Sequence, residues 1–226
     1  MNEAFAKIKQ EDDDELAAKA ESKRQAEGLT PEQFELMLAV ENKDVEVIKA
    51  LLAAKVDEEE KRAAVNIRTA NHGQTPLMRC AMAGTVDVSK ELIKAGAQII
   101  IKDGYGSSPL MYAAQSGCVE MAELFIEKGT WVNDADNYGD TVLMYARNNA
   151  QLTQLFLNID DDNINHQNKL GATAVMLAGN KDVLRVLIKH GADVNIRDNE
   201  YRTALSHAHY DTSTSMDDIL REAGGV

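Results

Sequence analysis

A short phrase that recurs along the chain constrains its fold more than any other feature. The phrase first reads Thr-Pro-Leu-Met-Arg-Cys-Ala, beginning at Thr75, and it returns in related form four times. The related copies begin at Ser108, Thr141, Thr173 and Thr203, so the successive spacings are 33, 33, 32 and 30 residues, and a degenerate first copy covers 36–39. Self-similarity at this period indicates stacked structural repeats, each of which buries its apolar face against its neighbours.

The residues of each copy predict two helices followed by a projecting turn. Thr or Ser before Pro begins the first helix, because the hydroxyl caps free backbone N–H groups and Pro needs no hydrogen bond there. A second helix follows, as at 119–126, where the apolar residues have helical spacing. Gly129 then ends the helix with a left-handed cap. An extended stretch leads from there to a turn at 136–139, which reads Asp-Asn-Tyr-Gly.

This pattern resembles the ankyrin repeat, whose consensus runs Asp-x-x-Gly-x-Thr-Pro-Leu-His-x-Ala-Ala. The resemblance covers roughly residues 34–226, and Gly-Ala-Asp-Val-Asn at 191–195 matches a second family signature almost letter for letter. It implies an all-α solenoid of helix–turn–helix repeats with projecting turn fingers. One departure is systematic, since Met replaces the consensus His in four copies and Ser206 replaces it in the last. This departure predicts a buried spine of methionines.

The repeats are expected to fill residues 29–226 and to number about six. The fourth is trimmed, and its second helix, near 152–157, is expected to be short. An enlarged and charged connection, 55–66, separates the first two repeats. The predicted units are 29–69, 70–102, 103–135, 136–167, 168–197 and 198–226, of which the first and last are atypical caps.

Residues 1–28 form a predicted acidic helical extension ahead of the array. Phe5 and Ile8 give it only a weak apolar stripe, so we expect a solvated helix that frays. A role for this helix in partner binding is the alternative. Thr-Pro-Glu-Gln at 30–33 has the form of a capping box and is expected to open the first repeat.

The charge of the chain indicates which partners it can attract. Its formal net charge is −13 and its sequence pI is about 4.8. A phosphate backbone would be repelled, so we expect no nucleic-acid partner. A basic protein is favoured because charge complementarity speeds encounter, although the acidity could also serve solubility alone. No stretch of 18 or more apolar residues occurs, so no membrane partner is expected.

Two further features bear on compartment and assembly. Cys80 and Cys118 fall at different positions of adjacent repeats, so both are expected to be thiols. The first residues lack the basic-then-apolar pattern of a secretory signal. As written, the chain is expected to be cytoplasmic, and periplasmic if a leader has been removed. Its polar terminal caps favour a monomer.

No catalytic, metal or cofactor site is predicted. The segment 134–140 resembles a calcium loop, but the twelfth position is Tyr145 rather than a bidentate Glu. His207 and His209 are two residues apart on an expected helix, so they face different directions. Motifs for a nucleophilic serine, a phosphate-binding loop and a zinc protease are absent. The chain is therefore expected not to be an enzyme and to use no cofactor.

The resemblance implies that first helices and turns line a concave binding face. Four of the six tyrosines fall at positions expected to be exposed there, and Trp131 replaces a polar turn residue. Tyr and Trp dominate interface energetics, although packing on neighbouring fingers would also explain them. The expected hot spot is Tyr105, Tyr112, Trp131, Tyr138 and Tyr145, with Arg79 and Asp140 at its rim and Leu177 also facing the partner.

The resemblance therefore implies a protein-binding module. The leading interpretation is that it sequesters or inhibits one protein partner, and its style is similar to that of small free-standing bacterial ankyrin proteins. Some of these are immunity proteins that shield the cell from its own peptidoglycan hydrolases, and an acidic, aromatic face suits a basic cell-wall hydrolase. A scaffold or assembly chaperone, a secreted effector that binds host proteins and a structural spacer are the alternatives.

Overall fold

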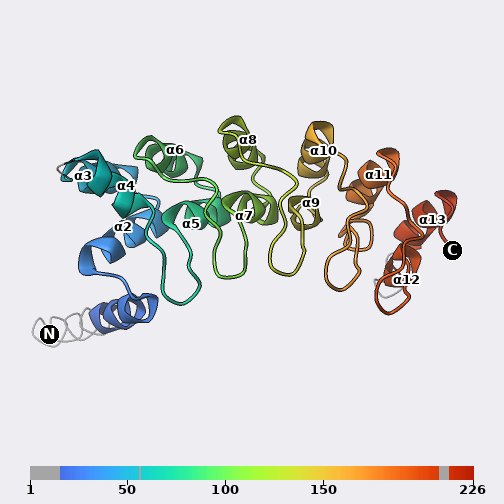
Figure 1. Cartoon of the computed structure of the whole chain (residues 1–226), viewed down its shortest axis with the longest axis horizontal. Helices are drawn as coiled ribbons and strands as arrows, with labels where there is room; N and C mark the ends of the chain where they lie inside the picture. Colours follow the sequence, from blue (N-terminus) through green and yellow to red (C-terminus); the bar gives the residue numbers. More distant parts are fainter. Residues whose placement is uncertain (1–15, 56, 209–213) are drawn as a thin grey trace, which may run out of the picture.

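A computed structural model describes residues 16–55, 57–208 and 214–226. Phe5, Ile8 and His209, which entered the predictions above, lie outside these ranges. Within them the chain is an all-helical solenoid, as predicted, and its only β-type pairing is one isolated bridge between Ala135 and Thr141. The helices stack in an inner and an outer row, and loops called fingers here project along one edge (Figure 1).

Each row has helices from successive units. The residues 16–27 are helical and precede both rows, and α4 (Glu58–Val65) lies beside the first pair. The inner row contains α2 (Pro31–Glu41), α5 (Pro76–Ala83), α7 (Pro109–Ser116), α9 (Val142–Tyr145) and α12 (Ala204–Ala208). The outer row contains α3 (Val45–Ala53), α6 (Val86–Lys94), α8 (Val119–Glu127), α10 (Ala150–Ile159), α11 (Lys181–Lys189) and α13 (Thr214–Glu222).

Hydroxyl caps begin the inner helices, as the recurring phrase predicts. The Thr30 hydroxyl accepts a hydrogen bond from the Gln33 N–H while the Gln33 side chain accepts one from the Thr30 N–H, which completes the predicted capping box. In α5 and α7 a methionine takes the third position, and its sulfur accepts the returning bond from the cap N–H. The methionine spine is buried as predicted, at Met78, Met111, Met144 and Met176.

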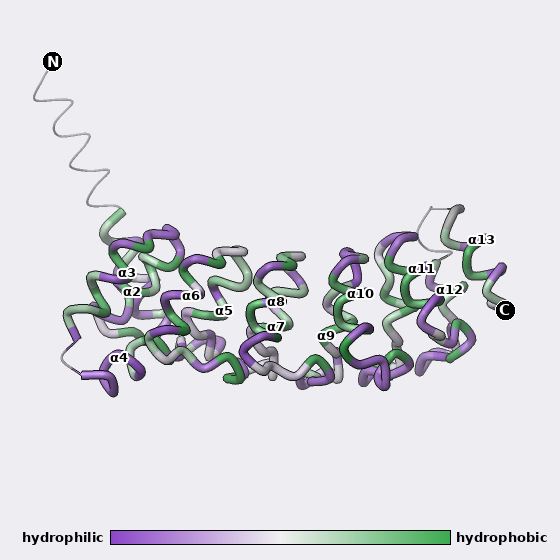
Figure 2. Tube along the Cα trace, turned by 90° about the horizontal axis from the view of Figure 1, so that it is seen from above, coloured by the Kyte–Doolittle hydropathy of each residue, from purple (hydrophilic) through white to green (hydrophobic). Residues whose placement is uncertain are grey.

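The core lies between the two rows and continues from unit to unit. It is built mostly from aliphatic side chains, with Phe125 and Phe156 among the largest that are fully buried. Apolar residues accordingly run along the helices throughout the array (Figure 2). Cys80 is buried in this core, Cys118 stands at the N-cap position of α8 without a side-chain cap bond, and both are thiols, as predicted. No helix in the described ranges is long and apolar enough to cross a bilayer.

Two units depart from the predicted helix lengths. The short helix of the fourth unit is its inner one, α9, with 4 residues, whereas α10 has 10, so the prediction of a short second helix was wrong. In the fifth unit the phrase that begins at Thr173 forms turns rather than a helix. The cause is the number of residues before the outer helix. Thr173 lies 8 residues before the start of α11, whereas Thr75 lies 11 residues before the start of α6, so the fifth unit lacks about one turn of helix.

The N-terminal helix does not remain a free, solvated helix at its end. The Ala70 N–H donates to the Glu27 carbonyl at 2.7 Å, and the Arg24 guanidinium donates to the Leu29 carbonyl at 2.7 Å. Gly28 makes this approach possible, because it has a φ of +66° and an added Cβ would lie 2.7 Å from the Ala70 Cβ. The prediction of a fraying helix is therefore wrong for its last turn.

Backbone hydrogen bonds join each finger to the next. The Gly104 N–H donates to the His72 carbonyl at 2.8 Å, and the Asn137 N–H donates to the Tyr105 carbonyl at 2.8 Å. The same link recurs from Lys169 to Tyr138 at 2.9 Å and from Asn199 to Leu170 at 3.0 Å. The bond from Ala70 to Glu27 puts the end of the N-terminal helix in the place of a preceding finger. The fingers therefore form one bonded row.

Candidate partner-binding face

The fingers and the inner helices form one continuous surface, which we call the inner face. A repeated bond fixes each finger to its own helix. The Tyr112 hydroxyl donates to an Asp103 carboxylate oxygen at 2.6 Å, and the Tyr145 hydroxyl donates to Asp136 at 2.8 Å. Both hydroxyls also reach the preceding finger, at Gln74 (3.2 Å) and Ser107 (3.4 Å).

These contacts change what the two helix tyrosines can contribute. Both are only partly exposed and pack against the core, so the prediction that they face solvent holds only in part. Burial and the hydrogen bond to Asp103 raise the pKa of Tyr112 to about 12. Burial and the bond to Asp136 likewise hold the pKa of Tyr145 well above its usual value. Their first role is to fix the fingers.

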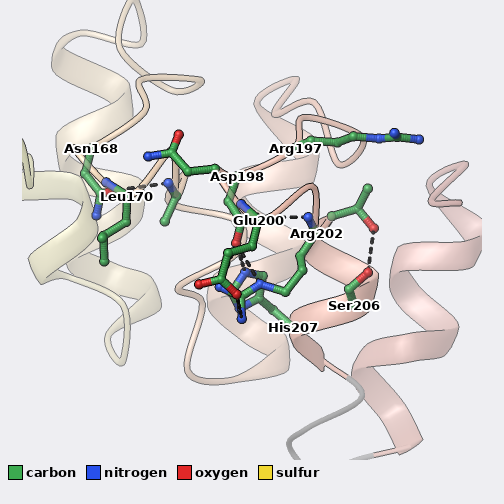
Figure 3. Close-up of polar contacts among 12 residues, drawn as sticks. Asn168, Leu170, Arg197, Asp198, Glu200, Arg202, Ser206 and His207 are labelled. Atoms are coloured by element: carbon green, nitrogen blue, oxygen red, sulfur yellow. Dashed lines mark hydrogen bonds and ion pairs between the residues drawn. The ribbon is translucent and has the colours of Figure 1, made fainter.

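The last unit makes the same bond with a histidine (Figure 3). His207 Nε2 lies 2.8 Å from Asp198 Oδ2, and the Arg202 Nε donates to the same oxygen at 3.0 Å. The N–H groups of Glu200 and Arg202 donate to the other carboxylate oxygen at 2.9 Å. Burial alone would raise the pKa of Asp198, but these donors together hold it well below its ordinary value.

Arg79 occupies the equivalent position in the second unit, but it lies under the N-terminal helix. Its Nη2 donates to Glu27 Oε1 at 2.7 Å, and its Nη1 contacts Glu41. The Glu27 side chain is 5% exposed and that of Arg79 is 16% exposed. The prediction that Arg79 lies at a solvent-facing rim was therefore wrong, because an intramolecular carboxylate already pairs with it.

The fingers carry four exposed apolar side chains of the inner face. Tyr105 is 44% exposed, Tyr138 56%, Leu170 73% and Tyr201 80%. His72, at the tip of the preceding finger, stacks on Tyr105 with a ring-centroid distance of 5.6 Å. The row of exposed tip side chains therefore begins at His72. Tyr105 and Tyr138 are exposed as predicted. Tyr201 was missed as a binding residue because it stands where the other fingers carry the turn glycine, and it keeps a positive φ of 63°.

A cavity of about 230 Å³ lies on the inner face beside the finger at 136–139. It brings together three predicted residues, Asp140, Tyr145 and Leu177. Two of its polar lining residues, Gln115 and Arg147, were not among the predicted binding residues. Both follow the recurring phrase, at the ends of shortened or terminating inner helices, where the repeat pattern specifies no side chain. The full lining is Gln115, Asp140, Met144, Tyr145, Arg147 and Leu177.

Trp131 does not lie with these residues. It follows the outer helix α8 in the sequence, and the loop after α8 leads to the finger at 136–139 (Figure 1). Its side chain is 82% exposed. The predicted single hot spot is therefore divided between the finger tips, the cavity and a separate site near the outer row.

Comparison with known proteins identifies the family. A family model described as ankyrin repeats (3 copies) matches residues 15–103, 36–136 and 99–160, and the single ankyrin-repeat model matches residues 170–199. The chain belongs to the ankyrin-repeat family. This ankyrin-repeat protein is also similar to a chain in the solved structure "Bd0816 Predatory Endopeptidase from Bdellovibrio bacteriovorus in complex with immunity protein Bd3460".

That similarity extends over most of both chains. The TM-score is 0.72 at 29% sequence identity, with 83% of this ankyrin-repeat protein and 97% of the other chain covered. A search of curated proteins found no match. The family and the structural neighbour together indicate a module that binds protein partners.

Proposed function

We propose that this ankyrin-repeat protein is an immunity protein that binds and inhibits a peptidoglycan hydrolase through its inner face. The observation that carries the proposal is the similarity, over 83% of the chain, to a structure of an endopeptidase in complex with an immunity protein. An identity of 29% at a TM-score of 0.72 means that the shape of the array is shared while most of its surface side chains differ. The partner of this chain would then be a different hydrolase from the endopeptidase in that structure.

The chemistry of the inner face supports this proposal. Exposed Tyr105, Tyr138 and Leu170 provide apolar anchors in a row, and such anchors carry most of the energy of protein interfaces. The cavity beside them has room for one partner side chain and is lined by the Arg147 guanidinium and by the Asp140 carboxylate, whose Oδ1 accepts a hydrogen bond from the Asn168 side chain at 2.6 Å. The net charge of −13 favours a hydrolase with a basic cleft, because complementary charge raises the rate of association.

Burial keeps three titratable side chains of the array neutral at physiological pH. Burial raises the pKa of Cys80 to about 11, so this thiol stays protonated and unreactive at neutral pH. The raised pKa values of Tyr112 and Tyr145 keep both phenols neutral. In the described ranges no group of three or more His, Cys, Asp and Glu side chains could hold a metal ion. In this proposal the inner face works by covering the partner's active site.

The test measures whether the protein inhibits purified endopeptidases encoded in the same genome. The activity of each enzyme is measured as the release of fragments from peptidoglycan sacculi. We expect one enzyme to bind and to lose activity at equimolar protein. A Tyr138→Ser/Leu170→Ser variant should bind that enzyme at least about 30-fold more weakly, because one central anchor is commonly worth about 2 kcal/mol. A matched control removes the exposed apolar residues Val47 and Ile159 of the outer helices and should inhibit like the original.

The outcomes separate the proposal from its alternatives. An enzyme that is bound but fully active would make the protein a scaffold rather than an inhibitor. The absence of binding to any of these endopeptidases would refute the proposal. A Tyr145→Phe variant, which loses only the hydroxyl that bonds Asp136, distinguishes a finger-fixing role from direct contact. It should keep its partner contacts through the ring.

A further inference from the structure

An asparagine bridges neighbouring units at one repeated position, three residues before the residue that opens each finger. The Asn66 side chain donates to the Gly96 carbonyl at 2.9 Å and accepts from the Gln98 N–H at 2.8 Å. Asn195 makes the same pair of bonds in the last unit, to the Gly224 carbonyl and from the Val226 N–H, both at 3.0 Å. The residues at this position are Asn66, Ile100, Asn133, Asn165 and Asn195.

Asn165 makes one of the two bonds, from the Asp193 N–H, and Asn133 contacts the Asp160 side chain instead, so the third unit is the one in which the asparagine itself is replaced. Ile100 stands in place of the bridging asparagine and is 68% exposed. Trp131 is the residue that faces Ile100 at this junction, because it has the place that Gln98 has at the preceding junction. Its side chain is 82% exposed. Ile100 thus removes the side chain that forms the bridge, while Trp131 keeps the backbone N–H and puts a large apolar side chain at the facing position of the same junction. In the described ranges the Gly129 carbonyl and the Trp131 N–H, which an asparagine would bond, have no hydrogen-bond partner.

Packing does not account for these replacements. An asparagine here would supply two hydrogen bonds, whereas Ile100 and Trp131 leave most of their apolar surface in water. Exposed apolar residues that lie together mark interaction sites, and tryptophan is the residue most enriched where binding energy concentrates. The two free backbone groups add a donor and an acceptor that are spaced to bond one amide.

The charges around this patch select its partner. The next asparagine, Asn133, contacts Asp160, which begins a turn whose Asp161 and Asp162 are exposed. The nearby cations Lys102 and Lys128 are already paired, with Asp134 at 2.6 Å and with Glu127 at 3.6 Å. The surroundings of the patch are therefore negative, and a positively charged segment fits them. A guanidinium or ammonium group would also be attracted to the indole face.

We propose that Ile100 and Trp131 form a second protein-docking surface, separate from the inner face. Its occupant is an extended segment of a partner protein in which an apolar residue adjoins Arg or Lys. The apolar side chain covers Ile100 and Trp131, and an amide of the segment bonds the Gly129 carbonyl and the Trp131 N–H. Because the patch follows α8 in the outer row, the protein could hold this segment while its inner face is occupied (Figure 1).

The experiment uses Trp131, the only tryptophan of the chain, as its own reporter. The full-length protein is titrated with the peptide Ser-Arg-Leu-Arg-Ser, blocked at both ends, and with two matched peptides, Ser-Glu-Leu-Glu-Ser and Ser-Arg-Ser-Arg-Ser. We expect a saturable blue shift of the emission and protection from acrylamide with the first peptide alone, at a Kd of about 1 mM or below.

Two variants test the assignment. Ile100→Asn restores the bridge and keeps the reporter, so it should weaken peptide binding at least about fivefold while the urea midpoint stays equal or rises. Gln98→Ala, which changes an exposed side chain at the equivalent position one unit earlier, should bind like the original. No saturable shift at about ten times the expected Kd, an equal response to the acidic peptide, or unchanged binding by Ile100→Asn would each overturn the proposal. None of these results depends on inhibition of a hydrolase.

Discussion

Removing the Glu27 carboxylate should destabilise the N-terminal end of the array, and the structure sets the size of the effect. Truncating one member of a buried ion pair costs about 3–5 kcal/mol, because the other charge is left without its partner. Glu27 is almost fully buried, but Arg79 would keep its contact with the more exposed Glu41. We therefore expect Glu27→Ala to lower the free energy of unfolding by about 2–3 kcal/mol.

Urea denaturation followed by circular dichroism measures this loss, and a double-mutant cycle with Arg79→Ala isolates the pair. The double variant should lose about 1–2 kcal/mol less than the sum of the single variants, since each side chain serves the other. Lys23→Ala is the control, because its exposed pair with Glu41 is worth under about 1 kcal/mol. A Glu27→Ala variant as stable as the original, or a coupling energy near zero, would refute the reasoning.

Three further predictions follow from the fixed fingers. The folded-state pKa values of Tyr112 and Tyr145 are raised, so their stabilising contribution is fully present below about pH 10 and is lost as the pH rises toward 12. Urea midpoints measured from pH 9 to 12 should fall for the original protein and fall less for Tyr112→Phe/Tyr145→Phe; parallel curves would contradict this. The pKa of Asp198 is lowered, so its contribution is present above its unfolded value near 3.8 and is lost as the pH falls below that value. Asp198→Asn should be less stable at pH 7 and should show a flatter acid unfolding curve, whereas a curve as steep as the original's would show that Asp198 does not drive it. Tyr201→Gly should raise the free energy of unfolding by about 1 kcal/mol, because a positive φ is strained for any residue with a Cβ; a lower urea midpoint would mean that the Tyr201 ring stabilises the finger.

The fold was predictable because its signal is periodic. The hydroxyl caps, the apolar stripes and the glycine stops recur in each unit, so errors in one copy are corrected by the others. Helix lengths in the fourth and fifth units were less predictable, because the number of residues between Thr173 and the next helix had to be compared across copies. The helix α4 was also missed, since its residues are charged and carry no repeat pattern.

The candidate site was predictable only in part, and contacts between units explain the failures. The repeat register correctly put Tyr105 and Tyr138 at exposed tips. It could not show that Tyr112 bonds Asp103, which lies nine residues earlier and approaches only when the finger folds back. Nor could it show that Arg79 pairs with Glu27, because the partner lies outside the repeats and 52 residues away. Register gives the direction of a side chain, but not its nearest neighbour.

The bonded row of fingers has a consequence for the thermodynamics of association. Each tip is tied by its backbone to the tip before it, from Glu27 through to Asn199, so the spacing between tips is set before any partner arrives. Ordering a loop on binding costs conformational entropy, and here that ordering has already occurred during folding. Binding through the tips should therefore proceed with little backbone rearrangement, and differences in affinity between partners should reside in their dissociation rates.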